Sequence, residues 1–278
     1  MGIFIVILLI IGLLVRIWFF NQKTSSKGKI NRTIVVLLIG GILCWGLLPH
    51  KKTEHVMQSR TSSTQHVAAN EAETNETNEV QLASSIQLDV PLLNQMDEPS
   101  LYNGCEVTSL AMLLNYIGMD VSKNELADKV VTVPFEDEAG KHGDPREGFV
   151  GDITGVNPGY SVYSAPMIDL ASQYVRSEQI VDLSEQDFDK ILAALSQKQP
   201  VWCITTVTFA ETNDMETWET AKGSIDISWN VHSVLITGFD KEHIFLNDPY
   251  GEKRAVDRDD FIAAWHQMGE QAFTIKSE

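Results

Sequence analysis

The 278-residue chain is long enough for one sizeable domain with appendages, and its 38 Asp and Glu residues outnumber its 21 Lys and Arg residues. The imbalance is uneven, because residues 1–82 hold 8 basic and 5 acidic side chains whereas residues 83–278 hold 13 and 33. This acidic excess argues against nucleic acid as a partner of the C-terminal part, since binding phosphates requires a basic face.

Two long apolar runs begin the chain. Residues 2–20 and 33–49 each have the length and hydrophobicity of a membrane-spanning helix, and neither has the polar face of a core helix. The loop between them carries four Lys or Arg residues, against two directly after the second run, so the positive-inside rule keeps the loop in the cytoplasm. No basic start or small-residue cleavage site marks a removable signal peptide. We therefore expect a two-helix membrane hairpin with everything after residue 50 extracytoplasmic.

A polar stretch follows the second apolar run. Residues 50–82 are rich in Thr, Ser, Asn, Gln and Glu and have no hydrophobic periodicity. This composition predicts a disordered tether. Such a tether would let a domain spanning residues 83–278 move near the membrane surface without a fixed orientation.

Helical patterns dominate the first half of that domain. An alternating stretch that starts at Ile86 and stops at Pro91 predicts an edge strand. Helices are predicted at 105–117, from a Ser122 capping box, from Ser164 and at 185–196. Between them, residues 133–163 form a long irregular segment rich in Gly, Pro and acidic residues, which predicts a functional or mobile loop.

The second half has the period-two pattern of strands. Consecutive strands are predicted at 201–209, 224–229, 232–239, 243–247 and 254–256, followed by a helix at 257–268 and a strand at 271–275. Helices followed by a meander of strands predict an α+β fold with the N-terminal helices packed on an antiparallel sheet.

The three cysteines have no metal-site spacing, and neither a metal nor an organic cofactor is expected. Cys44 lies in the second apolar run and Cys203 in a predicted strand, where each is expected to be a small buried hydrophobe. Cys105 stands instead at the start of a predicted helix. The helix dipole and the free N–H groups favour a thiolate there, although Glu106 opposes it. Cys105 is therefore the candidate nucleophile.

A cysteine nucleophile needs a base and a group that orients the base. Of the four histidines in the domain, His243 and His266 are expected near the surface, and His142 lies in the irregular segment, where it is a candidate substrate contact. His232 starts an apolar strand, and Asp248 closes the next strand sixteen residues later. Because neighbouring antiparallel strands bring such positions together, His232 is the candidate base and Asp248 its orienting residue.

Gln95 lies ten residues before Cys105. A side-chain amide at such a place can donate to the oxygen that becomes negative during acyl transfer, with the Cys105 backbone N–H as the second donor. Taken alone, Gln95 would be read as a surface residue in a loop, so this role depends on the other three residues.

Four separated motifs carry a resemblance to a known family. They are Asn94-Gln95, Asn103-Gly104-Cys105-Glu106-Val107-Thr108-Ser109-Leu110-Ala111-Met112, His232-Ser233-Val234 and Asn247-Asp248-Pro249. In this order they resemble the papain-like bacterial cysteine peptidases of family thirty-nine, the single-domain relatives of the bacteriocin leader peptidases of export transporters. The resemblance extends over residues 86–275 and includes the loop with Gly143-Asp-Pro and Gly148-Phe-Val-Gly-Asp.

The resemblance implies a papain-like cysteine peptidase fold and assigns the four candidate residues their roles. Cys105 would be the nucleophile, His232 the base, Asp248 its orienting residue and Gln95 the oxyanion-hole donor. The sequence contains no P-loop motif of an export ATPase, so cleavage of double-glycine leaders during export is not implied.

The sequence thus predicts a membrane-anchored, extracytoplasmic cysteine peptidase that hydrolyses a peptide or isopeptide bond of a peptide or protein substrate through a thioester. Two alternatives remain open. A cell-wall peptide hydrolase or amidase acting on peptidoglycan stems would use the same chemistry. A surface-tethered binding module would keep the fold without turnover, but it would not need all four residues. For the peptidase, the acidic composition favours basic substrates.

Overall fold

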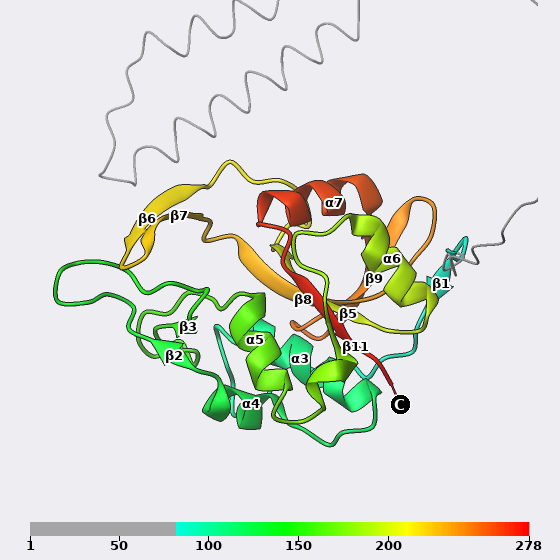
Figure 1. The fold of residues 1–278 in the computed structure, drawn as a ribbon, viewed down its shortest axis with the longest axis horizontal. Helices are drawn as coiled ribbons and strands as arrows, with labels where there is room; N and C mark the ends of the chain where they lie inside the picture. The colour runs from blue at the N-terminus through cyan, green and yellow to red at the C-terminus, as the bar shows by residue number, and fades with distance from the viewer. Residues whose placement is uncertain (1–81, 278) are drawn as a thin grey trace, which may run out of the picture. The chain divides into compact units, whose positions relative to one another are not determined.

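An antiparallel sheet lies at the centre of the residues that this computed structural model describes, 82–277 (Figure 1). Across the sheet its strands are β10 (Glu252–Asp257), β9 (His243–Asp248), β8 (Val231–Phe239), β5 (Val201–Thr206), β11 (Ala272–Ile275) and β4 (Ile180–Asp182). Each neighbouring pair is antiparallel, and β1 (Ile86–Gln87) adds to the end of β8. The α+β fold with an antiparallel sheet, predicted from the sequence, is therefore confirmed.

Helices cover both faces of the sheet (Figure 1). On one face lie α3 (Cys105–Tyr116), α4 (Lys123–Lys129) and α5 (Ser164–Ala171), and on the other lie α6 (Phe188–Ser196) and α7 (Arg258–Gln267). Strand β5 packs on both layers, with Trp202 and Ile204 toward α3 and with Val201 and Cys203 toward α6 and α7. Successive side chains of a strand point to opposite faces, so the run from Val201 to Ile204 is apolar on both faces because each face is covered by helices.

Helix α3 runs through the core from the candidate nucleophile. All nine residues from Glu106 to Leu114 are buried, and the chain leaves the helix at Gly118, whose φ of +92° is the left-handed conformation that glycine adopts without strain. The first turn of α3 therefore cannot shift without moving the core around it.

The segment between α4 and α5 packs against a hairpin that leaves the sheet. Within the segment, β2 (Thr132–Val133) and β3 (Phe149–Val150) form a short parallel pair. The hairpin strands β6 (Glu216–Thr220) and β7 (Gly223–Ile227) form a sheet of their own. Buried Trp218 of β6 stacks on His142, with 4.1 Å between the ring centroids. The predicted meander is thus correct for β8, β9 and β10 but is interrupted by β6 and β7.

Two helix starts differ in detail from the prediction. Helix α6 begins at Phe188 and not at 185, because Glu185 has a left-handed φ of 56° and the Asp187 side chain caps the helix. Ser122 Oγ caps α4 by accepting the Glu125 N–H, but the Glu125 carboxylate bonds to Lys129 and does not close the capping box.

The membrane and tether predictions fall outside the described part of the chain. Residues 1–81, which contain both predicted spans and all but the last residue of the predicted tether at 50–82, are not described by the structure. From residue 82 to residue 277, no helix has the length and hydrophobicity needed to cross a membrane. The described residues all lie within one compact unit.

Candidate active site

Cys105 is the first residue of α3, and its side chain is half-buried. A Cβ on the preceding Gly104 would lie 2.4 Å from the Leu101 Cβ, so glycine allows the loop to approach the helix start closely. The Cys105 thiol donates to Glu106 Oε2 at 3.3 Å and faces the backbone N–H of Ser233 on β8. The start of α3 is therefore held beside the start of β8.

The surroundings of the thiol oppose its ionisation. Burial and the Glu106 carboxyl raise the pKa of the Cys105 thiol well above its ordinary value, and the backbone N–H groups of Ser233 and Cys105 offset this only in part. The prediction that the helix start favours a thiolate is therefore wrong for this arrangement. Desolvation and a neighbouring negative charge outweigh the helix dipole.

His232 and Asp248 form a buried pair at the neighbouring ends of β8 and β9. His232 Nε2 lies 3.0 Å from Asp248 Oδ1, and the two side chains are 3% and 2% exposed. Because a carboxylate can only accept, Nε2 donates, and the neutral imidazole then has its lone pair on Nδ1. The contact is the one that the strand pattern predicts. Within the described residues, no hydrogen bond joins His232 to Cys105.

Two further residues hold this pair, and the sequence pattern does not single them out. Arg254 Nε on β10 donates to Asp248 Oδ2 at 2.8 Å, and the Tyr250 N–H donates to Oδ1 at 3.0 Å. The Tyr250 ring stacks on His232, with 5.3 Å between the centroids and 20° between the planes. Burial alone would raise the pKa of Asp248, but the hydrogen bonds from His232, Tyr250 and Arg254 hold it below its usual range. Asp248 is thereby kept ionised.

The contact between Arg254 and Asp248 should stabilise the fold in a pH-dependent way. The folded-state pKa of Asp248 is depressed, so its ionic contacts stabilise the fold above the ordinary carboxyl pKa and are lost as the pH falls through the folded-state pKa. We expect Arg254→Met to lower the free energy of unfolding by about 1 kcal/mol at pH 7, since the guanidinium is partly exposed and screened. Urea unfolding should show this difference shrinking below about pH 4. An equal difference at pH 7 and pH 3 would contradict it.

Gln95 is buried, but its amide points at the loop before Cys105. Its Nε2 donates to the carbonyls of Leu101 at 3.2 Å and Tyr102 at 2.8 Å, and its Oε1 has no partner among the described residues. The Gln95 backbone N–H bonds to the carbonyl of Pro249, directly after Asp248. The structure therefore ties Gln95 to both halves of the site, while its amide hydrogens are engaged by backbone carbonyls.

The remaining histidines lie away from this pair. His142 packs on Trp218, and His243 and His266 pair with the partly exposed Asp240 and Glu270. Within residues 82–277, no group of three or more His, Cys, Asp or Glu side chains is arranged to hold a metal ion.

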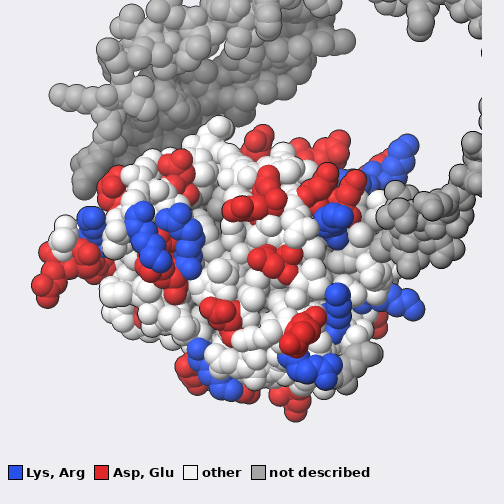
Figure 2. Space-filling view, in the orientation of Figure 1, with Lys and Arg blue, Asp and Glu red and all other residues white. Residues whose placement is uncertain are grey.

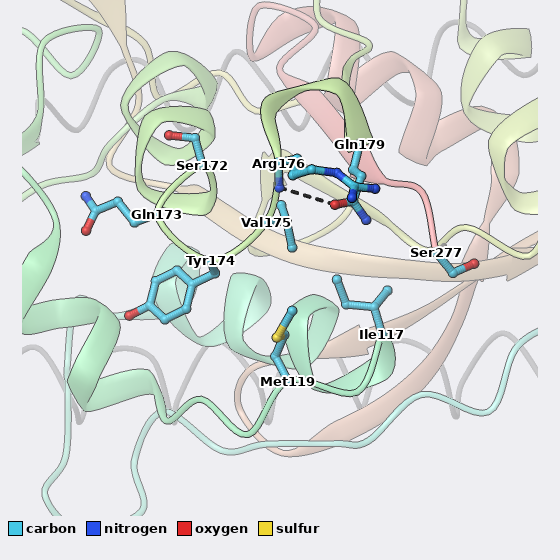
Figure 3. A pocket seen from close by; sticks show the side chains of 9 residues that line it. All are labelled: Ile117, Met119, Ser172, Gln173, Tyr174, Val175, Arg176, Gln179 and Ser277. Atoms are coloured by element: carbon cyan, nitrogen blue, oxygen red, sulfur yellow. Dashed lines mark hydrogen bonds between the residues drawn. The ribbon is translucent and has the colours of Figure 1, made fainter.

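A hollow of about 790 Å³ opens at the other end of α3 (Figure 3). Because a helix rises 1.5 Å per residue, the twelve residues of α3 separate this end from Cys105 by about 18 Å. The hollow is thus distinct from the candidate active site. Its lining residues are Ile117, Met119, Ser172, Gln173, Tyr174, Val175, Arg176, Gln179 and Ser277.

A cysteine at a helix start, beside a buried His–Asp pair on an antiparallel sheet, is the architecture of a cysteine peptidase fold. The chain belongs to the Peptidase_C39 like family, whose model matches residues 87–273. It is 43% identical over 251 residues to the uncharacterized protein YvpB of Bacillus subtilis (strain 168), covering 89% of this chain and 99% of YvpB. A crystal structure described as a C39-like peptidase from Bacillus anthracis is 37% identical, with a TM-score of 0.67 over 70% of this chain and 99% of that one.

Proposed function

We propose that this protein is a membrane-anchored, extracytoplasmic cysteine peptidase that hydrolyses peptide or isopeptide bonds. The observation that carries the proposal is the buried His232–Asp248 pair, with a separation of 3.0 Å, at the start of the strand against which Cys105 lies. A purely structural role would not require a buried imidazole whose second nitrogen is left to accept a proton.

Each step of the proposed reaction has a candidate group in this chain. Nδ1 of His232 takes the Cys105 proton as the sulfur attacks the carbonyl carbon, and the imidazolium then gives that proton to the leaving amine. Asp248 stabilises the imidazolium through Nε2. Water, activated by the same imidazole, hydrolyses the thioester and releases the acid.

The developing oxyanion requires two donors. The backbone N–H of Cys105 is one candidate, because the first N–H groups of a helix have no intrahelical acceptor. Gln95 is the other. Its Nε2 would have to release one of its present carbonyl partners, and the longer bond, 3.2 Å to Leu101, is the one expected to yield.

Charge and location complete the proposal. The apolar runs 2–20 and 33–49 and the basic loop between them support an anchor with the catalytic domain outside the membrane. On the face drawn in Figure 2, Asp and Glu side chains are widely spread and Lys and Arg occur in small groups. This distribution favours basic peptides, whose cleavage should slow as salt screens the attraction.

Hydrolysis by the full-length chain is the direct test. The chain and its Cys105→Ala variant would be incubated with a mixed peptide library and, separately, with purified peptidoglycan, and products identified by mass spectrometry. Cleavage that requires Cys105 supports the proposal, and the material that is cut separates protein peptides from wall stem peptides. Equal products with both chains, or none from wild type on either material, would contradict it and favour a binding module.

A further inference from the structure

A buried carboxyl beside the candidate nucleophile has no part in the proposed chemistry. Glu106 is fully buried in the first turn of α3. Its Oε1 accepts hydrogen bonds from Ser161 Oγ at 2.5 Å and from the Val162 N–H at 3.2 Å, and its Oε2 accepts the Cys105 thiol at 3.3 Å. Between residues 82 and 277, no Lys, Arg or His side chain pairs with it. The charge next to the sulfur is therefore uncompensated.

Neighbouring residues hold the backbone of Glu106 and set the pKa of its carboxyl. Trp202 Nε1 on β5 donates to the Glu106 carbonyl at 3.0 Å, which anchors the first turn of the helix. Two titratable groups interact with the Glu106 carboxyl, Tyr160 from the loop before α5 and Cys105 from the same helix. Burial raises the pKa of Tyr160 and keeps its phenol neutral. Burial also raises the pKa of Glu106, and the bonds from Ser161 and Val162 offset this in part.

Resting on the proposed cysteine chemistry, we propose that Glu106 is a positioning residue that binds the Cys105 thiol proton in the resting protein, so that attack requires the sulfur to exchange Glu106 for His232 as its partner. In the exchange, the thiol proton passes to His232 Nδ1 while the sulfur electrons attack the carbonyl carbon, and Glu106 keeps its charge. The resting thiol is thereby shielded from electrophiles and oxidants, which react with thiolates.

The loop before α5 controls this arrangement. Ser161 and Val162 hold Oε1, so they set the direction in which Oε2 faces the sulfur. A substrate that moves this loop would release the thiol, whereas a small reagent would meet it protonated.

Alkylation of Cys105 in the full-length chain tests the proposal. Rate constants for neutral iodoacetamide and anionic iodoacetate at pH 8 would be read by mass spectrometry of the Cys105 peptide. For Glu106→Gln, a one-unit fall in the thiol pKa would give tenfold more thiolate that is about threefold less nucleophilic, so iodoacetamide should react at least about threefold faster. The iodoacetate-to-iodoacetamide ratio should rise as well, because the repelling charge is gone.

Two matched variants distinguish the effect of the Glu106 charge on the thiol from the effect of the packing around it. Glu138→Gln removes the same charge from an exposed position in the segment before α5 and should change neither rate. Ser161→Ala breaks the bond to Oε1 but keeps the carboxylate, so the ratio should stay low. If Ser161→Ala accelerates both reagents as much as Glu106→Gln, or if the ratio is the same in Glu106→Gln and wild type, the proposal is overturned.

A comparison without any variant covers the case in which Glu106→Gln does not fold. Native wild type should show an iodoacetate-to-iodoacetamide ratio several-fold below that of the same chain in urea, and equal ratios would overturn the proposal. The peptidase proposal and the proposed role of Glu106 can be rejected independently of each other. Absence of Cys105-dependent hydrolysis together with the expected ratios would reject the peptidase alone, while hydrolysis with unchanged ratios would reject only the role of Glu106.

Discussion

Replacing His232 with alanine is expected to reduce the kcat of hydrolysis by about 10⁴-fold or more. The Cys105 thiol is held protonated by burial and by Glu106, so the helix start alone supplies little thiolate. Without an imidazole at position 232, the thiol proton stays on the sulfur, hydrogen-bonded to Glu106, and no base is left in the proposed mechanism to take it and return it to the leaving amine. Steady-state kinetics on a peptide identified from the library would measure the loss.

A surface histidine provides the control for this substitution. His266 lies on α7, is half-exposed and pairs with Glu270. His266→Ala should keep the wild-type rate, and the two rates would be compared at a temperature where urea titration shows both variants to be folded, because His232→Ala also removes a buried hydrogen bond to Asp248. A His232→Ala rate within tenfold of wild type would show that another group activates the thiol and would remove the basis of the proposed mechanism.

The sequence is sufficient to predict the contact between His232 and Asp248, because both residues lie at the ends of strands. His232 begins one apolar strand and Asp248 ends the next, so the period-two pattern alone brings them together. Arg254 is different, because its contact with Asp248 depends on the register of β10 on β9, in which Glu252 faces Asp248. Tyr250 carries one signal in the sequence, its place in the turn directly after Asp248.

The ionisation of the thiol could not be predicted from the sequence, because it depends on long-range packing. Helical spacing does indicate that Glu106 is buried, since it is a charged residue at the start of an apolar run whose members are all buried. Burial of the thiol and the neighbouring Glu106 carboxyl outweigh the local preference for a thiolate, and Ser161, 55 residues from Glu106, holds that carboxyl in place.

Among the elements of the fold, the short strands escape prediction for a similar reason. Residues 180–182 carry too few side chains to show a period, and β4 exists because β11 pairs with it from about 90 residues away. Trp218 likewise takes β6 out of the sheet by packing on the segment that contains His142. Local pattern predicts the long elements, and tertiary contacts decide the short ones.

Trp202 connects the core to the active site, and its removal should have the second large effect. Its side chain is fully buried on the α3 face of β5, lies 4.9 Å from the Phe273 ring between centroids, and donates to the Glu106 carbonyl. We expect Trp202→Ala to lower the free energy of unfolding by about 3–5 kcal/mol through the cavity it leaves. The folded fraction should also lose about 10²-fold in kcat, because the first turn of α3 loses the anchor that positions Cys105.

Trp265 is the matched control, because it is as buried as Trp202 but makes no hydrogen bond to the first turn of α3. It is equally buried on the opposite face of the sheet, and its Nε1 also donates to a backbone carbonyl, that of Gln271, at 3.3 Å. Trp265→Ala should therefore cost a similar free energy of unfolding, measured by urea titration, while the folded protein keeps its kcat. If both variants lose kcat equally at a temperature where both are folded, the effect of Trp202 is general loosening of the core. If only Trp202→Ala loses it, the bond from β5 to the first turn of α3 is what holds the nucleophile in place.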